Sequence, residues 1–500
     1  MNIQQAKQQI IYAMKAYFAK DEHGNYLLPT EKQRPVFMMG APGIGKTAII
    51  EQIAQELEVG FVSYSMTHHT RQSALGLPFI AKRNYGGTEY DVSEYTMSEI
   101  IAAVYDTMEA TGKQEGILFL DEINCVSETL TPAMLQFLQY KVFGRHKVPQ
   151  GWIVVTAGNP PEYNRTVHDF DIATWDRLKR IDVEPDFPAW RSYALSAGVH
   201  PSVTTYLDIQ QDSFYHVETT VDGANFVTAR SWDDLSSMIK LSEANGLPVD
   251  ELLIGQYLQD GQIAQRFAVY YELFTKYRSD YQVDTILEDG APIDIVERAS
   301  LAGFDERIAL VGLVADSLCA RLRSAVLNEK AAGFIHGHLA DIRDESADAN
   351  DVSQAALEHL DAIQEQAARD RSAGLQTDEK YESSEQAIAL LSQALKERDQ
   401  GSALDFDKLK APFEARLDAL DAEVAKGLSA VENALAFAQA AFGKGQETLI
   451  LATDLAANKY ALAFLNDHPS QAYLECTQSL DFDDRASSLA SKIAQIDLES

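Results

Sequence analysis

The sequence has little cysteine, and its three cysteines form no recognisable pattern. Cys125, Cys319 and Cys476 are odd in number and lie far apart along the chain. This spacing gives neither a disulfide framework nor the closely spaced pairs of a zinc site. We therefore expect a protein of a reducing compartment, with no fold held together by disulfides.

Long apolar runs are also missing. The chain contains no run of about 18 apolar residues, the length needed to cross a bilayer. The segment from Met1 to Lys20 has lysines spread through it and lacks the apolar block of a signal peptide. These two features predict a soluble, cytoplasmic protein without a membrane span.

Basic residues are scarce relative to acidic ones. The 500 residues include 42 Lys and Arg against 75 Asp and Glu, for a formal net charge of −33. Such a charge repels phosphate backbones and anionic lipids, so broad binding to nucleic acid is disfavoured, although a local basic pore remains compatible with it. The composition, with 46% hydrophobic and 23% charged residues, is that of a globular protein large enough for about three domains.

The first part of the chain alternates between strand-like and helix-like segments. The buried-strand patterns are Arg34–Met39, Val59–Tyr64, Gly116–Leu120 and Trp152–Ala157. Helical spacing occurs at Ile3–Phe18, Lys46–Leu57, Met97–Glu109 and Ser127–Tyr140. This alternation predicts an α/β fold, with a parallel sheet covered by helices on both faces. Two stretches, Phe79–Tyr95 and Lys141–Gly151, interrupt the rhythm and are typical of β-hairpins.

After about Pro188 the strand patterns fade. We expect helices at Trp190–Ala197, Ser231–Leu241 and Glu251–Tyr277, and an almost entirely helical, acidic region beyond residue 280. There, an apolar seam from Phe413 to Leu435 has helical spacing and predicts a bundle core.

Two segments of the helical region, Asp341–Asp351 and Arg371–Glu385, are expected to be loops between long helices. The predicted domains are an α/β nucleotide-binding domain over 1–187, a helical lid over 188–279 and an acidic helical C-terminal domain over 280–500.

A glycine-rich segment after the first strand matches the phosphate-binding loop G-x-x-x-x-G-K-[ST]. Its residues are Gly40, Ala41, Pro42, Gly43, Ile44, Gly45, Lys46 and Thr47. The glycines let backbone N–H groups point at phosphates, at the start of the helix that follows. Lys46 is expected to neutralise the β- and γ-phosphates, and the Thr47 hydroxyl to ligate Mg²⁺. A simple glycine-rich turn is the alternative, but the strand before and the helix after favour nucleotide binding.

Two acidic residues end the strand Gly116–Leu120. Asp121 is expected to hold Mg²⁺ through its water shell, and Glu122 to polarise the water that attacks the γ-phosphate. A solvated acidic turn is the alternative. The pair favours hydrolysis over phosphoryl transfer to a metabolite, because a kinase needs a substrate hydroxyl in place of the water.

A polar residue follows the strand Trp152–Ala157. Asn159, in the sequence Gly-Asn-Pro, is expected to contact both the γ-phosphate and the attacking water from the strand next to the acidic one. By itself, an Asn beside a proline would indicate an ordinary turn. The order of phosphate loop, acidic strand and polar-tipped strand favours the catalytic interpretation.

These motifs together resemble an AAA+ ATPase, and more narrowly its MoxR branch. The resemblance lies in the phosphate loop, in Leu-Asp-Glu-Ile-Asn at 120–124, in Met-Leu-Gln-Phe-Leu-Gln at 134–139 and in Ala-Gly-Asn-Pro at 157–160. The two hairpin-like interruptions fall where that branch has its helix-2 and pre-sensor-1 insertions. The resemblance covers about residues 30–245. It departs from the branch at Cys125, where an arginine often stands, and the helical C-terminal half matches no accessory domain we recognise.

The resemblance implies two further catalytic arginines. Arg177, in an Asp-Arg pair before a strand, matches the arginine that reaches the γ-phosphate of a neighbouring subunit, with Arg180 as the alternative. Arg230, before a lid helix, matches the sensor-2 arginine, which acts on the γ-phosphate within its own subunit.

The resemblance also implies ATP and Mg²⁺ as cofactors and a homo-oligomer, a hexameric ring, that remodels or matures a client protein. A von Willebrand factor type A protein is the partner it suggests. A nucleic-acid-directed motor and a nucleotide-gated scaffold with slow hydrolysis remain as alternatives. Two histidine pairs are weak patterns for a metal site. His68 and His69 are adjacent, so in a strand their side chains point to opposite faces, and His336-Gly-His338 has no Cys or carboxylate partner at a convincing spacing.

Overall fold

The computed structural model describes residues 1–68, 74, 76–127, 129–143, 145–163, 167, 170–220, 223–349, 352–372, 374–399 and 405–478. The chain divides into two compact units. The first consists of Met1–Ala189 with Glu365–Thr377, and the second of Trp190–Gln364 with Asp378–Ser500.

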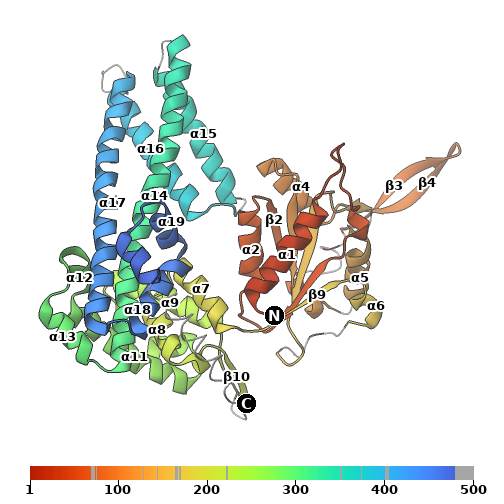
Figure 1. Ribbon diagram of the computed structural model, residues 1–500. Helices are drawn as coiled ribbons and strands as arrows, with labels where there is room; N and C mark the ends of the chain where they lie inside the picture. Colours follow the sequence, from red (N-terminus) through yellow and green to blue (C-terminus); the bar gives the residue numbers. More distant parts are fainter. Residues whose placement is uncertain are drawn as a thin grey trace, which may run out of the picture. The chain divides into compact units, whose positions relative to one another are not determined.

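A five-stranded parallel sheet forms the centre of the first unit (Figure 1). Its strands are β1 (Val36–Gly40), β2 (Gly60–Ser65), β5 (Gly116–Asp121), β8 (Trp152–Gly158) and β9 (Lys179–Val183). They lie in the order β2-β5-β8-β1-β9, so β1 sits between β8 and β9 and every neighbouring pair is parallel. All residues of β1 and β8 are buried, which explains their continuous apolar sequences.

Helices cover both faces of this sheet. They are α1 (Ile3–Tyr17), α2 (Lys46–Glu56), α4 (Glu99–Thr111), α5 (Thr131–Tyr140) and the short α6 (Ile172–Trp175). Leu118 and Leu120 of β5 share a core with α4 and α5, whereas α2 contacts β5 from the other face. Three short 3₁₀ helices, η1 (Thr30–Lys32), η2 (Met66–His68) and η3 (Ile123–Cys125), lie in the connections. The predicted α/β class is confirmed.

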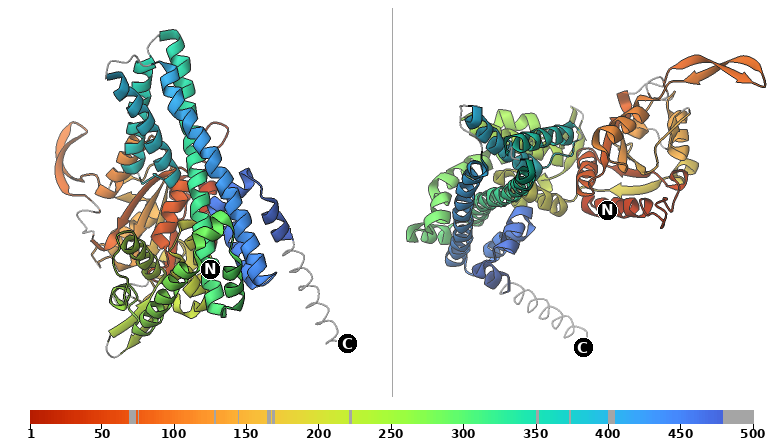
Figure 2. Two further views of the ribbon diagram at one scale, coloured as in Figure 1. Left: turned by 90° about the vertical axis from the view of Figure 1, so that its left-hand side faces the viewer. Right: turned by 90° about the horizontal axis from the view of Figure 1, so that it is seen from above.

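Both predicted hairpins of the first unit are present. The long one consists of β3 (Pro78–Tyr85) and β4 (Thr88–Tyr95), and it projects away from the sheet (Figures 1 and 2). The short one consists of β6 (Val142–Phe143) and β7 (His146–Lys147). Glu94 links the two, because its carboxylate accepts hydrogen bonds from Arg83 and from Arg145, each at 2.8 Å. The bond from Arg83 is the main reason that the pKa of Glu94 is lowered.

The second unit is mostly helical. It begins within α7 (Phe187–Ala197) and continues through α8 (Pro201–Ile209), η4 (Gln211–Ser213), α9 (Ala229–Ala244), α10 (Glu251–Tyr257), α11 (Gly261–Tyr281), α12 (Val283–Asp289) and α13 (Ile293–Leu301). The remaining helices are α14 (Phe304–Ala349), α15 (Val352–Ser372), α16 (Asp378–Asp399), α17 (Phe406–Phe442), α18 (Gln446–Ala457) and α19 (Lys459–Asp467). Of α15, the part up to Gln364 belongs to the second unit, and the part from Glu365 onward belongs to the first. The long helices α14 and α17 run side by side (Figures 1 and 2).

The apolar seam from Phe413 to Leu435 lies on α17 and contributes to two adjoining cores. Val431 and Leu435 pack with α14, α18 and α19, and Phe413 packs with α14, α15 and α16. The prediction that the seam is a bundle core is confirmed except at Leu417, whose side chain is exposed.

The sequence missed a hairpin in the second unit. It is formed by β10 (His216–Thr220) and β11 (Gly223–Val227), two short strands that pair with each other. The single helix expected at Glu251–Tyr277 is wrong, because the chain breaks between α10 and α11. Asp260 caps α11 there, since its Oδ1 accepts hydrogen bonds from the backbone N–H groups of Gln262 and Ile263.

Both loops predicted in the C-terminal region are partly wrong. The segment Asp341–Asp351 is not a loop over most of its length, because α14 continues to Ala349, and residues 350 and 351 lie outside the described residues. The segment Arg371–Glu385 also includes the first turns of α16, which begins at Asp378. Not all of the charge in these segments is solvated, because the Glu379 carboxylate on α16 pairs with Lys330 and Lys459.

The helices before and after residue 280 share one core. The predicted boundary at 279/280 falls inside α11, and Phe274 and Tyr281 on that helix pack in the same cluster as Leu310 and Leu435. A buried ion-pair network adds to this. The Arg191 guanidinium on α7 binds the carboxylates of Asp208 on α8 and Asp454 on α18, with N–O distances of 2.5 Å and 2.7 Å.

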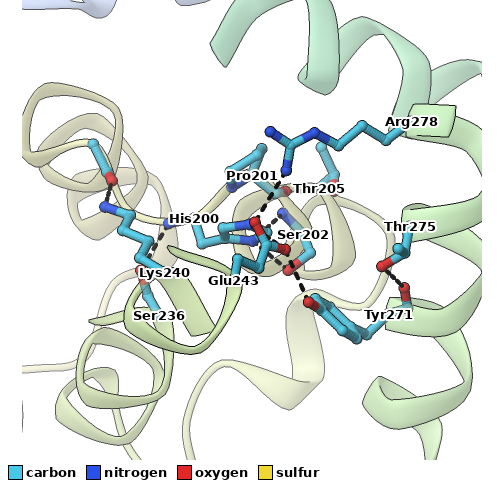
Figure 3. Close-up of polar contacts among 11 residues, drawn as sticks. His200, Pro201, Ser202, Thr205, Ser236, Lys240, Glu243, Tyr271, Thr275 and Arg278 are labelled. Atoms are coloured by element: carbon cyan, nitrogen blue, oxygen red, sulfur yellow. Dashed lines mark hydrogen bonds and ion pairs between the residues drawn. The ribbon is translucent and has the colours of Figure 1, made fainter. Parts of the chain in front are cut away.

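A second polar cluster joins α8, α9 and α11 (Figure 3). The Glu243 carboxylate accepts hydrogen bonds from Tyr271 at 2.9 Å and from Arg278 at 3.0 Å, and it lies 3.3 Å from Nε2 of the buried His200. These donors, His200 foremost, lower the pKa of Glu243 to about 2.

In the part of the chain that the structure describes, no single helix has the length and hydropathy needed to cross a membrane. The helices α18 and α19, bent by 85° at the break between them, meet these two criteria only as a pair.

Candidate functional site

The phosphate loop connects β1 to α2 in the backbone conformation that its glycines allow. Gly43 and Gly45 have positive φ angles of 71° and 89°, a region that favours glycine. Gly45 is the N-cap of α2 and has no side chain to cap the helix, so the first N–H groups of α2 remain suited to an anion. The loop therefore has the form predicted from the sequence.

Lys46 is the buried cation of this loop. Its ammonium donates hydrogen bonds to the backbone carbonyls of Gly40 and Ala41 and to Oδ1 of Asn159, each at 2.8 Å. Lys46 therefore contacts both ends of the predicted site, the loop itself and the tip of β8.

Thr47 and Asp121 form the second pair. The Thr47 hydroxyl donates to Oδ2 of Asp121 at 2.9 Å, and Oδ1 of Asp121 accepts from the backbone N–H of Glu122, also at 2.9 Å. Oxygen atoms from a hydroxyl and a carboxylate are ligands that Mg²⁺ accepts, directly or through its waters. The structure thus places the two predicted metal-binding residues in contact.

Glu122 follows Asp121 in an unusual backbone conformation. Its φ of 55° lies in the left-handed region, which for a residue other than glycine costs about 1–2 kcal/mol. Its Oε2 accepts hydrogen bonds from Ser65 Oγ at 3.1 Å and from Thr67 Oγ1 at 3.2 Å. The carboxylate is therefore held by two hydroxyls at the end of β2.

The sequence analysis missed Ser65 and Thr67. Ser65 lies opposite Asp121 in the parallel pairing of β2 with β5, which brings the ends of the two strands together. The sequence did contain a signal for them, because hydroxyl side chains stand at the carboxyl end of a predicted strand, where the site residues of a parallel sheet gather.

Asn124 holds the backbone at Asn159 in place. Its side-chain amide donates to the backbone carbonyl of Asn159 at 2.8 Å, and Asn124 itself is buried. The fit is tight, since a Cβ atom at Gly158 would lie 2.3 Å from Oδ1 of Asn124. The sequence places Asn124 in a motif without identifying it as a site residue. Its position fixes the strand tip from which Asn159 reaches Lys46.

The two arginines before β9 have different surroundings. Arg180 forms an ion pair with Asp182, whose Oδ1 lies 2.8 Å from its Nε, and its Cζ lies 4.7 Å from the centroid of the Trp175 ring. It lines a cleft of about 420 Å³ beside the first residues of the phosphate loop. The Arg177 side chain is exposed, and among the residues that the structure describes no carboxylate lies within 4.0 Å of its guanidinium.

Arg230 is the second residue of α9 and belongs to the second unit, where it is exposed. The helix begins with a capping box formed by Thr228 and Ser231. Arg230 thus lies in the first turn of α9, at a helix start as expected. The lid domain and the sensor-2 role of Arg230 stay predictions.

The histidine pairs give no metal centre in the described residues, where no group of three His, Cys, Asp or Glu side chains is arranged to hold an ion. His68 lies in η2, and His69 lies outside the described residues. His336 and His338 lie on α14, and His338 contacts another histidine, His359, that the sequence did not single out.

Residues 35–178 match the family model of the AAA domain, dynein-related subfamily. The chain contains an AAA domain. The match begins just before β1 and ends before β9, so it includes the phosphate loop, Asp121, Glu122 and Asn159. An AAA domain implies nucleotide binding, usually with Mg²⁺, and its family typically hydrolyses ATP. No curated protein matched the chain.

The residues of this AAA domain fit a magnesium–nucleotide complex. The uncapped start of α2 and the Lys46 ammonium would hold phosphates, and the Thr47 and Asp121 oxygens would hold Mg²⁺. When bound, Mg²⁺ would neutralise charge on the phosphates.

Proposed function

We propose that the chain is a cytoplasmic, ring-forming ATPase of the MoxR type that uses ATP hydrolysis to remodel or mature a client protein. The observation that supports hydrolysis best is the position of Glu122. Its carboxylate follows directly on Asp121, which contacts Thr47 of the phosphate loop, so a base stands beside the predicted Mg²⁺ site.

Each polar residue of the site has a role in this proposal. Glu122 accepts a proton from the attacking water. Lys46 and Asn159, hydrogen-bonded to each other, orient the γ-phosphate from one side. Arg177 acts on the phosphate of a neighbouring subunit, and Arg230 acts within its own subunit.

The environment of the two arginines favours Arg177 over Arg180 as the residue that acts across the ring. Arg180 is already bound by Asp182 and stacked on Trp175, and moving it would break both contacts. Arg177 is exposed and has no ion pair among the described side chains, so it can reach a neighbouring subunit at little cost.

The MoxR assignment is supported by the hairpins β3–β4 and β6–β7, which lie between β2 and α4 and between α5 and β8. The resemblance in sequence implies the two insertions of that branch at these points. A hexameric ring and a von Willebrand factor type A partner follow from the same assignment. A nucleic-acid motor is less compatible with the net charge of −33.

One observation favours a second function, a nucleotide-gated scaffold with slow hydrolysis. Ser65 and Thr67 both donate to Oε2 of Glu122, so one of the two carboxylate oxygens is already held by protein hydroxyls. In that case the basal rate is low, and a client or partner protein accelerates hydrolysis by releasing Glu122.

The proposal is tested by steady-state phosphate release from Mg²⁺-ATP, measured with the purified full chain over a range of protein concentrations. Turnover whose rate per subunit rises with concentration, as the chain assembles, supports a ring ATPase with shared sites. A measurable but very slow rate that no assembly changes supports the scaffold. ATP binding without any phosphate release, at concentrations where the chain is oligomeric, contradicts both.

A further inference from the structure

Two histidines on neighbouring helices of the second unit face each other at hydrogen-bond distance. Nδ1 of His338 on α14 lies 2.8 Å from Nδ1 of His359 on α15, and the two rings meet edge to face with centroids 5.1 Å apart. Both residues are only partly exposed; the His359 side chain is 14% exposed. This contact joins two helices that the sequence analysis did not connect.

The groups around the pair come mainly from α14. Oε2 of Glu345 lies 3.4 Å from Nε2 of His359, and the ring of Phe334 stands edge-on to His338 with centroids 4.6 Å apart. The Asp341 carboxylate favours the charged form of His338.

The other helices that pack here contribute apolar groups. The core behind the pair is made by Leu391 and Leu395 of α16 and Leu409 and Phe413 of α17, and His336 lies against Phe413. In the described part of the chain, the carboxylates facing the two imidazoles are therefore those of Asp341 and Glu345.

The geometry fixes the number of protons between the two rings. A contact of 2.8 Å between nitrogens needs one N–H donor and one lone pair, so a single proton lies between the two Nδ1 atoms. If both imidazoles are charged, two N–H groups face each other and the contact must open.

We propose that His338 and His359 form a proton-operated latch between α14 and α15, closed while at most one of the two rings is charged and open when both are. The latch connects the two helices at near-neutral pH and releases them on acidification. It does not depend on nucleotide hydrolysis, and its test uses no ATPase assay.

The direction of the pH effect follows from the energetics of the pair. Burial, followed by the neighbouring His359, lowers the pKa of His338 below its ordinary value. The unfolded chain therefore binds more protons than the latched state at mildly acidic pH, so the stabilisation is lost as the pH falls through the ordinary histidine range. Above that range the latch is complete.

The test is hydrogen exchange of the full chain, pulse-labelled after incubation between pH 7.5 and pH 5. We expect the amides of Val352–Ser372 to lose protection several-fold as the pH falls, because charging both rings opens the contact that connects this helix to α14. In His338→Gln, which can pair with one neutral or charged imidazole, this pH dependence should disappear. His336→Gln is the matched control, since His336 lies two residues away against Phe413 and outside the pair.

Equal loss of protection in wild type and in His338→Gln would overturn the latch. A second measurement is independent of any variant: NMR of histidine-labelled wild-type protein should show two coupled imidazoles, with the second protonation below the ordinary histidine range. Two histidines that titrate independently at ordinary values would also overturn it.

Discussion

Lys46 and Asn159, 113 residues apart in sequence, meet through a hydrogen bond of 2.8 Å between Nζ and Oδ1. The contact joins the phosphate loop to the carboxyl end of β8. Asn124 holds that end in place, because its side-chain amide donates a hydrogen bond to the backbone carbonyl of Asn159. Because the backbone at this position is held by Asn124, the Asn159 side chain can be changed without releasing the strand end.

Asn159→Ala should therefore reduce hydrolysis and leave nucleotide binding largely intact. Losing one positioned polar group of this kind typically costs about 10²-fold or more in rate. The measurement is phosphate release at saturating ATP, together with ATP affinity. Asn159→Asp is the control, because it keeps an oxygen for Lys46 but loses the amide donor; activity close to wild type in both variants would remove Asn159 from the catalytic set.

Removing the hydroxyls of Ser65 and Thr67 is expected to raise the hydrolysis rate, the opposite of the effect of Asn159→Ala. The double variant Ser65→Ala, Thr67→Val frees Oε2 of Glu122, so basal hydrolysis should rise, by up to about tenfold for 1.4 kcal/mol of relief. The check is the basal phosphate-release rate at equal protein concentration. A fall in rate would mean that the two hydroxyls position Glu122 for catalysis rather than restrain it.

Arg177→Ala is expected to bind ATP normally and to form assemblies that do not hydrolyse it. Losses of about 10³–10⁵ in rate are known when such an arginine is removed. Mixing Arg177→Ala with Glu122→Gln subunits should restore part of the activity, since each subunit supplies what the other lacks. Arg180→Ala is the comparison, and the assignment moves to Arg180 if that variant alone loses hydrolysis and is rescued by mixing.

The lowered pKa of Glu243 predicts that the free energy of unfolding of the second unit depends on pH. Its pKa is lowered to about 2, so the stabilisation by His200, Tyr271 and Arg278 is complete above the ordinary glutamate pKa and is lost as the pH falls from there toward 2. Glu243→Gln should cost about 2 kcal/mol at neutral pH, after allowance for partial exposure. Chemical unfolding at several pH values checks this, and a cost that stays constant down to pH 3 would contradict the assigned cause.

Much of the first unit could be predicted from the sequence because its signals are local. The phosphate loop places Lys46 and Thr47 by spacing alone, and the apolar strands before Asp121 and Asn159 fix where these side chains emerge. The parallel order of the strands then brings them together.

The missed features depend on contacts between distant segments. Ser65 meets Glu122 only through the register of β2 on β5, and His338 meets His359 only through the packing of α14 on α15. The errors in the helical region have a local cause. The acidic run from Asp341 onward has the composition of a loop, yet Ile342 is buried and keeps α14 continuous. At Asp260 the opposite happens, because this residue caps the start of α11 and so interrupts what the apolar spacing predicts to be one helix.

The most direct test of the proposed activity is a comparison of Glu122→Gln with Lys46→Ala in ATP binding and in phosphate release. Glu122→Gln keeps the size and hydrogen bonding of the side chain but removes the charge that orients water. It should therefore bind Mg²⁺-ATP like the wild type and lose about 10²–10⁴-fold in hydrolysis. Lys46→Ala removes a phosphate contact and should lose binding itself. A Glu122→Gln variant that still hydrolyses ATP at more than half the wild-type rate would contradict the account.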